Sequence, residues 1–536
     1  MKAQCLPFSQ IPHTTKLFAD FLAWAPAIRP FYPRPPQFAE WASQEAPRLR
    51  YDKDRRERVS AALERQNRVW NASPKTLENI ARLRAGACAV VTGQQVGLFG
   101  GPLFSIFKAL TAVKLADEGT KAGVPCVPVF WLATEDHDLA EVNHASIPAP
   151  DMSLQRLTAT PECLPDAPVG GAKFGAEIEP LVESAVALLG DSPTASLLRE
   201  CYRPGETLGS AFARLFAGIF AEWGVILLDA SDPELHAVCR PIYRAAAERA
   251  VELESALLAR GRSMEEAGYH QQVKVVAGST LLFTLHNGSR VPVHRKGKSE
   301  DFVVGETGIS RSELLAQIEA EPHRFSANVL LRPVVQDYLL PTLAYTGGAA
   351  ELAYFGQAGV IYEALLGRVT PIIPRFSATL LEAKPQSLLE RYSLTLPDLF
   401  HGPDRLRELL ATRTLPQELN QAFEQAGSAM DACLNAIKEA LARLDKTLVD
   451  SAVHAGEKMH YQLDQLRTRA ARAEVRQSEV LQRHAELLSR TLYPEKTLQE
   501  REFAGIYFLS RHGGELLQGL YGAWQSGCLD HQVICV

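Results

Sequence analysis

The spacing of apolar residues predicts a parallel α/β core in the first two-thirds of the chain. Residues 87–92 form a short, continuous apolar run that ends at Gly93, and residues 125–132 form a second one. Such runs are typical of strands that are buried on both faces. Between them, residues 103–122 carry apolar side chains at helical spacing. A strand, a glycine-rich turn, a helix and a second strand within about 45 residues predict a βαβ unit.

The same pattern returns further along the chain, and two insertions interrupt it. Residues 212–223 predict an apolar helix, residues 224–229 a third buried strand, and Pro233 the start of another helix. The sheet is expected to resume within 325–376, which makes 85–378 one open parallel-sheet core. An insertion near 148–205 gives no clear pattern. A second insertion near 270–305 indicates β structure, with strands at 273–276, 281–286 and 291–295 and a hairpin turn at Asn287-Gly288.

Residues 1–84 predict a helical lead-in to this core. A proline-rich break lies at 30–36, and helix-forming residues fill 55–70. Ser73-Pro74 has the sequence of a helix cap followed by proline at the first helical position.

Residues 379–500 have a different periodicity, with apolar residues at alternating steps of four and three. One run comprises Met430, Leu434, Ile437, Leu441, Leu444 and Leu448, and a second begins at Met459, Leu463 and Leu466. This spacing predicts a coiled-coil seam. The slip near 451–458 indicates a loop or a stutter, so an antiparallel two-helix hairpin and a dimer-forming coil both fit. Residues 501–536 are apolar and aromatic enough to pack back on a domain.

Composition and charge narrow the class of protein. The chain has 536 residues, 46% of them hydrophobic, and a net charge of −6. These values predict two or three folded domains and argue against nucleic acid or membrane as a partner. The short basic run Arg290–Lys298 is interpreted as a solvated hairpin face. The nine cysteines contain no CxxC pair, so neither a disulfide framework nor a zinc site is expected. The N-terminus has no continuous apolar stretch typical of a signal peptide, and a reducing cytoplasm is the expected compartment.

The first candidate site is the turn at residues 92–102. Its glycines would let a ligand approach the backbone, and the following helix offers free N–H groups to a phosphate or carboxylate. The turn has neither a P-loop sequence nor GxGxxG, and an ordinary tight βα connection is the alternative. The predicted substrate-binding residues here are Thr92, Gly93, Gln94, Gln95, Gly100 and Gly101.

The second candidate site follows the strand that ends at Leu132. Glu135, Asp136, His137 and Asp138 are consecutive ionisable residues, and we predict a catalytic role for them. The carboxylates could orient a general base, or bind a cationic amine or Mg²⁺. A solvated loop with an aspartate helix cap is the alternative. No second His or Cys stands at ligand spacing, so no resident metal is predicted.

The third candidate site lies within 325–351. Asn328, Arg332, Gln336 and Asp337 are polar residues inside an apolar stretch. The Arg332 guanidinium suits a carboxylate or phosphate, and the following proline favours an extended backbone at Arg332. A buried structural salt bridge is the alternative.

Three blocks of sequence resemble the bacillithiol-biosynthesis cysteine-adding family. They are residues 91–103 (VTGQQVGLFGGPL) with Lys108, residues 128–138 (PVFWLATEDHD) continuing to Glu141 and Asn143-His144, and residues 325–333 (FSANVLLRP) continuing to Gln336-Asp337, Pro341, Tyr345 and Gly347-Gly348. Ala349-Ala350 is a small departure. The order of the blocks, the length and the late coiled coil also agree, so the resemblance covers nearly the whole chain.

The resemblance implies a Rossmann-like core with inserted connecting segments and a coiled-coil domain that supports a homodimer. It implies an amide-forming carbon–nitrogen ligase that joins L-cysteine to glucosaminyl-malate in the last step of bacillithiol synthesis. It also brings Lys108, Asn143 and Tyr345 into the substrate-binding set. Because a carboxylate is a poor electrophile, ATP or another adenine nucleotide, with Mg²⁺, is the expected means of activation. The alternative is a non-catalytic nucleotide-binding or coiled-coil scaffold protein.

Overall fold

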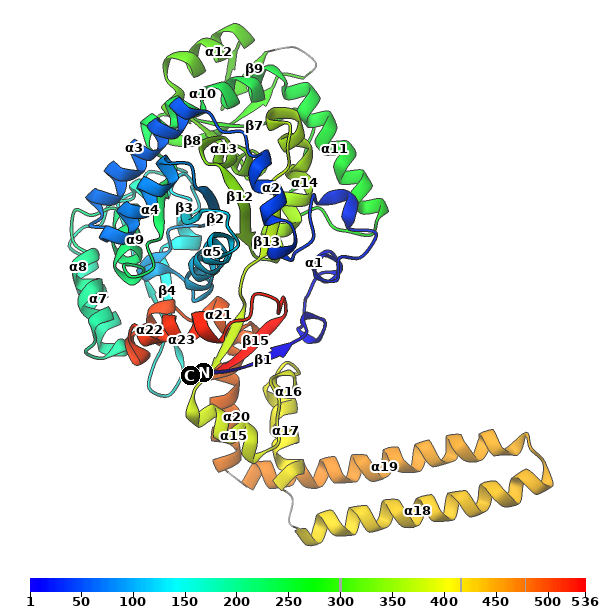
Figure 1. Cartoon of the computed structure of the whole chain (residues 1–536). Helices are drawn as coiled ribbons and strands as arrows, with labels where there is room; N and C mark the ends of the chain where they lie inside the picture. Colours follow the sequence, from blue (N-terminus) through cyan, green and yellow to red (C-terminus); the bar gives the residue numbers. More distant parts are fainter. Residues whose placement is uncertain (298–300, 415–416, 478) are drawn as a thin grey trace. The chain divides into compact units, whose positions relative to one another are not determined.

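The computed structural model describes residues 1–297, 301–414, 417–477 and 479–536. The chain divides into two compact units. One unit comprises residues 1–379 and 500–534, and the other comprises residues 380–499 with 535–536. Figure 1 labels their helices and strands.

A five-stranded parallel sheet forms the centre of the first unit. The strand order is β13-β12-β2-β3-β6, and each neighbouring pair is parallel. The strands are β2 (Cys88–Gln94), β3 (Cys126–Leu132), β6 (Ile226–Asp229), β12 (Thr342–Gly347) and β13 (Ile372–Pro374). The predicted βαβ unit is confirmed, since α5 (Phe104–Lys121) connects β2 to β3. The carboxyl ends of these strands therefore meet at one edge of the sheet.

Helices cover both faces of the sheet because successive residues of a strand point to opposite sides. In β2, Ala89 and Val91 belong to one hydrophobic cluster, and Val90 belongs to another that contains residues of α5. The first cluster draws on α3 (Lys53–Val69), α4 (Pro74–Arg84), α10 (Pro233–Glu248), α11 (Ala250–Glu266), α13 (Arg332–Leu339) and α14 (Ala349–Leu366). The sequence anticipates the start of α4, where the Ser73 hydroxyl accepts a hydrogen bond from the Thr76 N–H.

The second predicted insertion is a five-stranded antiparallel sheet of order β10-β9-β8-β7-β11. Its strands are β7 (Ser279–His286), β8 (Ser289–Arg295), β9 (Phe302–Val304), β10 (Thr307–Ile309) and β11 (Phe325–Ala327), and α12 (Arg311–Ala320) precedes β11. Asn287 and Gly288 form the hairpin turn, both with positive φ, as their sequence predicts. Residues 273–276, predicted as a strand, form none. Residues 325–327 join this sheet rather than the parallel one.

Two further segments surround the parallel sheet. The insertion near 148–205 contains a two-stranded sheet and two helices: β4 (His144–Pro148), β5 (Leu154–Thr158), α7 (Ile178–Leu189) and α8 (Pro193–Cys201), which lead into α9 (Leu208–Ile219). The N-terminal segment is not purely helical, because β1 (Lys2–Leu6) precedes α1 (Lys16–Leu22) and α2 (Ala42–Glu45).

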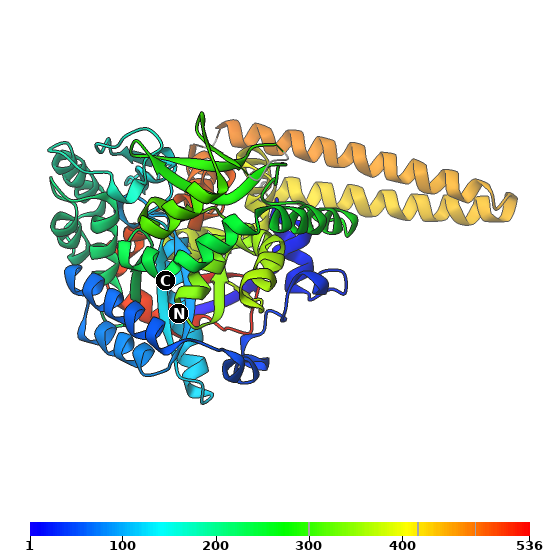
Figure 2. The same cartoon turned by 90° about the horizontal axis from the view of Figure 1, so that it is seen from above.

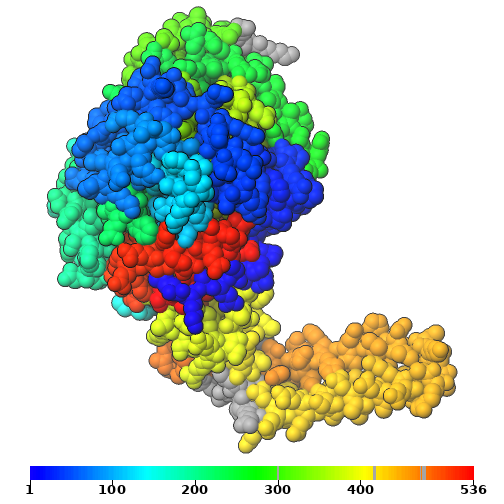
Figure 3. All heavy atoms as spheres, viewed as in Figure 1, coloured from blue at the N-terminus to red at the C-terminus, as the bar shows by residue number. Residues whose placement is uncertain are grey.

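The C-terminal residues of the first unit pack beside its N-terminal residues and α5. They contain α22 (Gly505–His512), α23 (Glu515–Ala523) and β15 (His531–Cys535), and β15 pairs with β1. In Figure 3 the two ends of the chain, blue and red, lie next to each other. A disulfide joins Cys5 to Cys528, although the cysteine pattern predicts no disulfide framework. Pairs formed by residues this distant in sequence leave no local spacing signal.

The second unit is helical. After β14 (Ala378–Leu381) the chain forms α15 (Ala383–Arg391), α16 (Leu396–Leu399), α17 (Pro403–Thr414), α18 (Gln417–Leu444), α19 (Leu448–Gln477) and α20 (Glu479–Leu492). α18 and α19 run antiparallel as a long hairpin, which Figures 1 and 2 show from two directions. The turn lies at residues 445–447, and the predicted slip at 451–458 falls inside α19. Among the described residues, no helix is long and apolar enough to span a membrane.

Candidate active site

A cavity of about 670 Å³ lies at the carboxyl ends of β2, β3 and β12 in the first unit. The β2 end contributes Gly93, Gln94 and Gln95, and strands β7 and β8 of the antiparallel sheet form part of another wall. In open α/β sheets, ligands bind at this edge.

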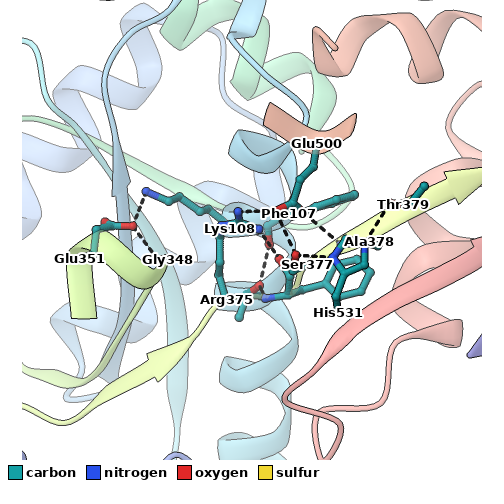
Figure 4. Close-up of polar contacts among 12 residues, drawn as sticks. Phe107, Lys108, Gly348, Glu351, Arg375, Ser377, Ala378, Thr379, Glu500 and His531 are labelled. Atoms are coloured by element: carbon teal, nitrogen blue, oxygen red, sulfur yellow. Dashed lines mark hydrogen bonds and ion pairs between the residues drawn. The ribbon is translucent and has the colours of Figure 1, made fainter. Parts of the chain in front are cut away.

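A buried ion pair between Lys108 and Glu351 occupies one end of the cavity. The Lys108 Nζ lies 2.6 Å from Glu351 Oε2 and donates to Gln94 Oε1 at 2.8 Å. The Glu351 carboxylate also accepts from the Tyr345 hydroxyl at 2.6 Å and the Gly348 N–H at 2.8 Å. Figure 4 shows Lys108 and Gly348 converging on this carboxylate. Burial raises the pKa of Glu351, but Lys108 and the hydrogen bonds outweigh it and hold the pKa below its usual value.

A second buried ion pair, between Arg375 and Glu500, lies at the same end of the cavity. The Glu500 side chain is 1% exposed, and its Oε1 accepts from Arg375 Nη2 at 2.6 Å and from the Ser377 hydroxyl at 3.0 Å. The Ala378 N–H donates to the other carboxylate oxygen at 3.0 Å. Arg375 lines the cavity, whereas Glu500 comes from the C-terminal segment. Glu500 therefore fixes the Arg375 side chain from outside the cavity.

His531 completes this network, as Figure 4 shows. Its Nδ1 lies 2.7 Å from the Ser377 hydroxyl and its Nε2 lies 2.9 Å from the Thr379 hydroxyl. Burial lowers the pKa of His531 to about 4. The ring is therefore neutral near pH 7 and adds no charge beside Arg375.

Arg332 and Arg501 add positive charge, and neither forms a salt bridge within 4.0 Å with a carboxylate of the described residues. The Arg332 guanidinium donates to the Tyr354 hydroxyl at 2.7 Å and to Gln336 Oε1 at 3.2 Å. Both arginines line the cavity, together with Ala349 at the N-terminus of α14. Since Lys108 and Arg375 are already paired, the excess charge of this end comes from these two guanidinium groups.

Carboxylates gather at another part of the cavity wall, where Glu135, Asp136 and His137 follow β3. Asp136 Oδ2 accepts from Gln95 Nε2 at 2.7 Å, and Asp136 Oδ1 accepts from the His137 N–H at 2.7 Å. Gln95 Nε2 also donates to Glu141 Oε2 at 2.6 Å. One amide thus bridges two carboxylates and holds them close together.

Arg290 is buried beside this acidic cluster, so its interpretation as part of a solvated basic face is wrong. Its guanidinium donates to the Ser326 hydroxyl at 2.9 Å, to the Ala327 carbonyl at 2.8 Å and to His137 Nδ1 at 3.1 Å. Lys298, at the other end of the predicted basic run, lies outside the described residues. An arginine can only donate, so His137 Nδ1 accepts and the proton of the neutral ring is on Nε2.

Two consecutive residues link the two ends. Gln94 accepts from Lys108 at the cationic end, and Gln95 donates to Asp136 at the acidic end. Consecutive Cα atoms are about 3.8 Å apart. The turn after β2 therefore lies between opposite charges of one cavity.

The structure separates the sequence-predicted residues into two groups. Ten line the cavity: Gly93, Gln94, Gln95, Lys108, Glu135, Asp136, His137, Asn328, Arg332 and Tyr345. The others lie outside the lining formed by the described residues: Thr92, Gly100, Gly101, Asp138, Asn143, Gln336 and Asp337.

The residues outside the lining have local structural contacts. The Thr92 hydroxyl donates to the Thr346 carbonyl, and the Asn143 amide donates to the Ala159 carbonyl. Asp337 accepts hydrogen bonds from Gln336 and Tyr362.

Two predictions about local structure change as well. Asp138 caps α6 (Leu139–Val142), since its Oδ1 accepts from the Glu141 N–H at 3.2 Å. Arg332 was expected to be extended before Pro333 but begins α13. The Arg332 N–H donates to the Asn328 carbonyl at 2.8 Å, and proline tolerates the first helical turn because it lacks an N–H.

Sequence reasoning missed Arg290, Glu351, Arg375 and Arg501 as lining residues. Only Glu351 carries a usable signal, because it stands three positions after Gly348 at the start of a helix, the spacing of a capping box. The arginines reach the cavity through tertiary packing.

The sequence matches the models of two domains of one family, and the two matches together cover residues 1–376 and 378–536. Residues 1–376 match the family "Bacillithiol biosynthesis BshC, N-terminal Rossmann-like domain", and residues 378–536 match "Bacillithiol biosynthesis BshC, C-terminal coiled-coil domain". The chain belongs to the BshC family. It is 49% identical, over all of both chains, to "Putative cysteine ligase BshC" of Koribacter versatilis, and 36% identical over all of both chains to the protein of that name in Solibacter usitatus. The protein of that name in Salinibacter ruber is 33% identical over 97% of this chain and 96% of its own.

The BshC cavity contains no preformed metal site, since no group of three His, Cys, Asp or Glu in the described part of the chain could hold a metal ion. The Asp136 and Glu141 carboxylates are bridged by the Gln95 amide.

Proposed function

We propose that this BshC protein forms an amide bond between L-cysteine and glucosaminyl-malate. The observation that carries the proposal is the polarity of the cavity, which has the Glu135 and Asp136 carboxylates on one part of its wall and the Arg332 and Arg501 guanidinium groups on another. Glucosaminyl-malate has the same polarity, with an amine on its sugar and two carboxylates on its malate.

The cationic end suits the malate group. Arg332 and Arg501 can each donate to a carboxylate, and the N–H groups at the start of α14 add donors. Phosphate shares this chemistry, so the same donors also suit an anionic phosphate chain.

The acidic end suits the amino groups of the two substrates. Glu135 and Asp136 can bind the α-ammonium of cysteine and accept the proton that the attacking amine loses. The two carboxylates have different partners: the neutral Gln95 amide contacts Asp136, and His236 contacts Glu135. His137 presents an Nε2–H donor, which suits the negative charge that develops on the carbonyl oxygen during attack.

Carboxylate activation by ATP or another adenine nucleotide would supply the leaving group. Lys108, Arg375 and the α14 N-terminus are the groups that would contact its phosphates. The described residues offer no resident Mg²⁺ site, so we propose that any Mg²⁺ enters with the nucleotide.

We propose in addition that the long hairpin of the second unit supports a homodimer. Ile437, Leu444 and Leu466 remain 50%, 78% and 57% exposed on α18 and α19. Exposed apolar side chains on these two paired helices suit an interaction surface.

The decisive experiment is product formation. The purified chain is incubated with cysteine, glucosaminyl-malate and each nucleotide in turn, and bacillithiol is sought by mass spectrometry. Product that requires the active chain supports the proposal, and its absence under every nucleotide condition contradicts it.

A further inference from the structure

A histidine that does not line the cavity contacts the Glu135 carboxylate. His236 lies near the start of α10, and its Nε2 is 3.1 Å from Glu135 Oε1. The His236 side chain is 3% exposed, whereas the Glu135 side chain is 17% exposed and reaches the cavity. Any effect of His236 on a bound molecule therefore passes through Glu135.

Both ring nitrogens of His236 face acceptors. Nε2 faces the Glu135 carboxylate, Nδ1 lies 3.3 Å from the Tyr243 hydroxyl, and the ring forms a hydrogen bond with the Phe325 backbone. A ring that donates from both nitrogens is an imidazolium.

The charges around the ring agree with that protonation state. Burial lowers the pKa of His236, but Glu135, the Phe325 carbonyl and Asp229 together raise the pKa above its usual value. Tyr243 and Cys239, on the same helix, are fully buried and have pKa values far above neutral pH, so both are uncharged. Arg290 completes the set of charged groups near Glu135.

We propose that His236 is a positioning residue for Glu135, which it holds as an oriented carboxylate with one oxygen presented to an ammonium group in the cavity. Oε1 is occupied by His236, and Oε2 has no hydrogen-bond partner among the described residues. Without the imidazolium, Oε1 loses the partner that orients the carboxylate, and the Glu135 charge stands partly buried beside Asp136 without this cation. The inference rests on the proposed function, which places amino groups at this end.

The test is direct binding, which needs neither nucleotide nor turnover. Isothermal titration calorimetry of the full-length chain compares L-cysteine with 3-mercaptopropionate, which lacks the ammonium group. His236→Gln keeps a donor near Nε2 but removes the charge, and Glu135→Gln removes the carboxylate. His323→Gln, at an exposed position outside the cavity lining, is the matched control.

We expect the wild type to prefer L-cysteine, and Glu135→Gln to lose that preference. His236→Gln should weaken cysteine binding by about tenfold or more, the usual effect of losing a charge-assisted interaction. It should leave 3-mercaptopropionate binding unchanged. Because His236→Gln removes the cation that contacts the Glu135 carboxylate, the acid limb of cysteine binding should move to higher pH. A merely structural role for His236 would not produce that shift.

Two results would overturn the inference, and they differ in what they say of the proposed function. If Glu135→Gln loses cysteine binding while His236→Gln keeps wild-type affinity and an unshifted acid limb, the positioning role fails and the proposed function stands. If the wild type has no affinity for cysteine, both fail.

A measurement on the wild type covers the case in which His236→Gln does not fold. Selective ¹⁵N-histidine NMR reports the protonation of each ring. A doubly protonated His236 ring at pH 7 supports the inference, and a neutral ring overturns it.

Discussion

Asp136 and Asp138 stand two positions apart in one acidic run, yet their side chains do different things. Asp136 lines the cavity and accepts from Gln95, whereas Asp138 caps a four-residue helix. The sequence alone places both in the site, since helix capping and catalysis favour the same residue type.

The pair therefore serves as an internal comparison. Asp136→Asn should lower the proposed ligase activity by about 100-fold or more, because the proposed role needs negative charge at this position to receive an amine or its proton. Asp138→Asn should stay near wild type, because asparagine caps a helix about as well as aspartate. Product formation and the melting temperature of both variants decide the matter. Equal activity of the two variants would place Asp136 outside the chemistry.

The Lys108–Glu351 pair should make the first unit sensitive to acid. Glu351 has its folded-state pKa below the ordinary value of 4.5, so its contribution to stability is present above that pH and is lost as the pH falls through the folded-state pKa. Glu351→Gln should therefore lower the urea midpoint strongly at pH 7 and progressively less as the pH falls below 4.5. A difference between wild type and variant that is constant across this range would contradict the assignment.

Removing the cation instead should be costly at neutral pH. Lys108→Met leaves a buried carboxylate without its partner, which typically costs about 3–5 kcal/mol. The double variant Lys108→Met with Glu351→Gln should recover most of that loss in urea unfolding. Failure of the second substitution to rescue the first would show that the two side chains are not coupled.

At the scale of elements, the strand-rich and helical parts of the core could be predicted and their tertiary partners could not. The short apolar run at residues 126–132 forms a buried strand, as its sequence predicts. Asn287 and Gly288 readily adopt positive φ, which favours the hairpin turn. Arg290 lies next to that turn and looks solvated in sequence, but the antiparallel sheet brings it to the end of β3. Its contact with His137 joins two positions that are 153 residues apart in the sequence.

The glycine-rich turn after β2 illustrates a related limit. Gly100 and Gly101 suggest a ligand approaching the backbone, but both adopt positive φ of 87° and 69° and lie outside the cavity lining formed by the described residues. The backbone conformation of the turn, and not a ligand, accounts for glycine at these two positions.

Gly101→Ala should accordingly destabilise the fold rather than act on binding alone. Its backbone conformation is one that side chains rarely adopt, and such strain costs about 1–3 kcal/mol. The expected result is a lower melting temperature, with cysteine affinity retained in the folded fraction. Gly171→Ala, whose added Cβ would meet no heavy atom within 4 Å, is the control and should be neutral. An unchanged melting temperature for Gly101→Ala would contradict the strain.

At the scale of the whole molecule, the coiled-coil periodicity is satisfied only in part within the hairpin. Leu434 is buried against α19, where it packs on Gly456, but Ile437, Leu444 and Leu466 remain exposed. The sequence could not distinguish an intramolecular from an intermolecular seam, because both use the same spacing.

These exposed residues predict a dimer. Sedimentation velocity of the wild type at micromolar concentration should give a dimer, and Ile437→Lys combined with Leu466→Lys should give a folded monomer. Glu439→Lys, an exposed charge reversal on α18, should remain dimeric. A monomeric wild type would mean that the hairpin alone accounts for the seam.

The adjacent residues Gln94 and Gln95 also link the two charged ends of the cavity. Gln94 accepts from Lys108 at the cationic end, and Gln95 donates to Asp136 at the acidic end. Both contacts start from adjacent Cα atoms, about 3.8 Å apart, at the end of one strand. A change of backbone conformation at this turn therefore displaces a contact at each charged end of the cavity, so a single substitution there acts on both ends together.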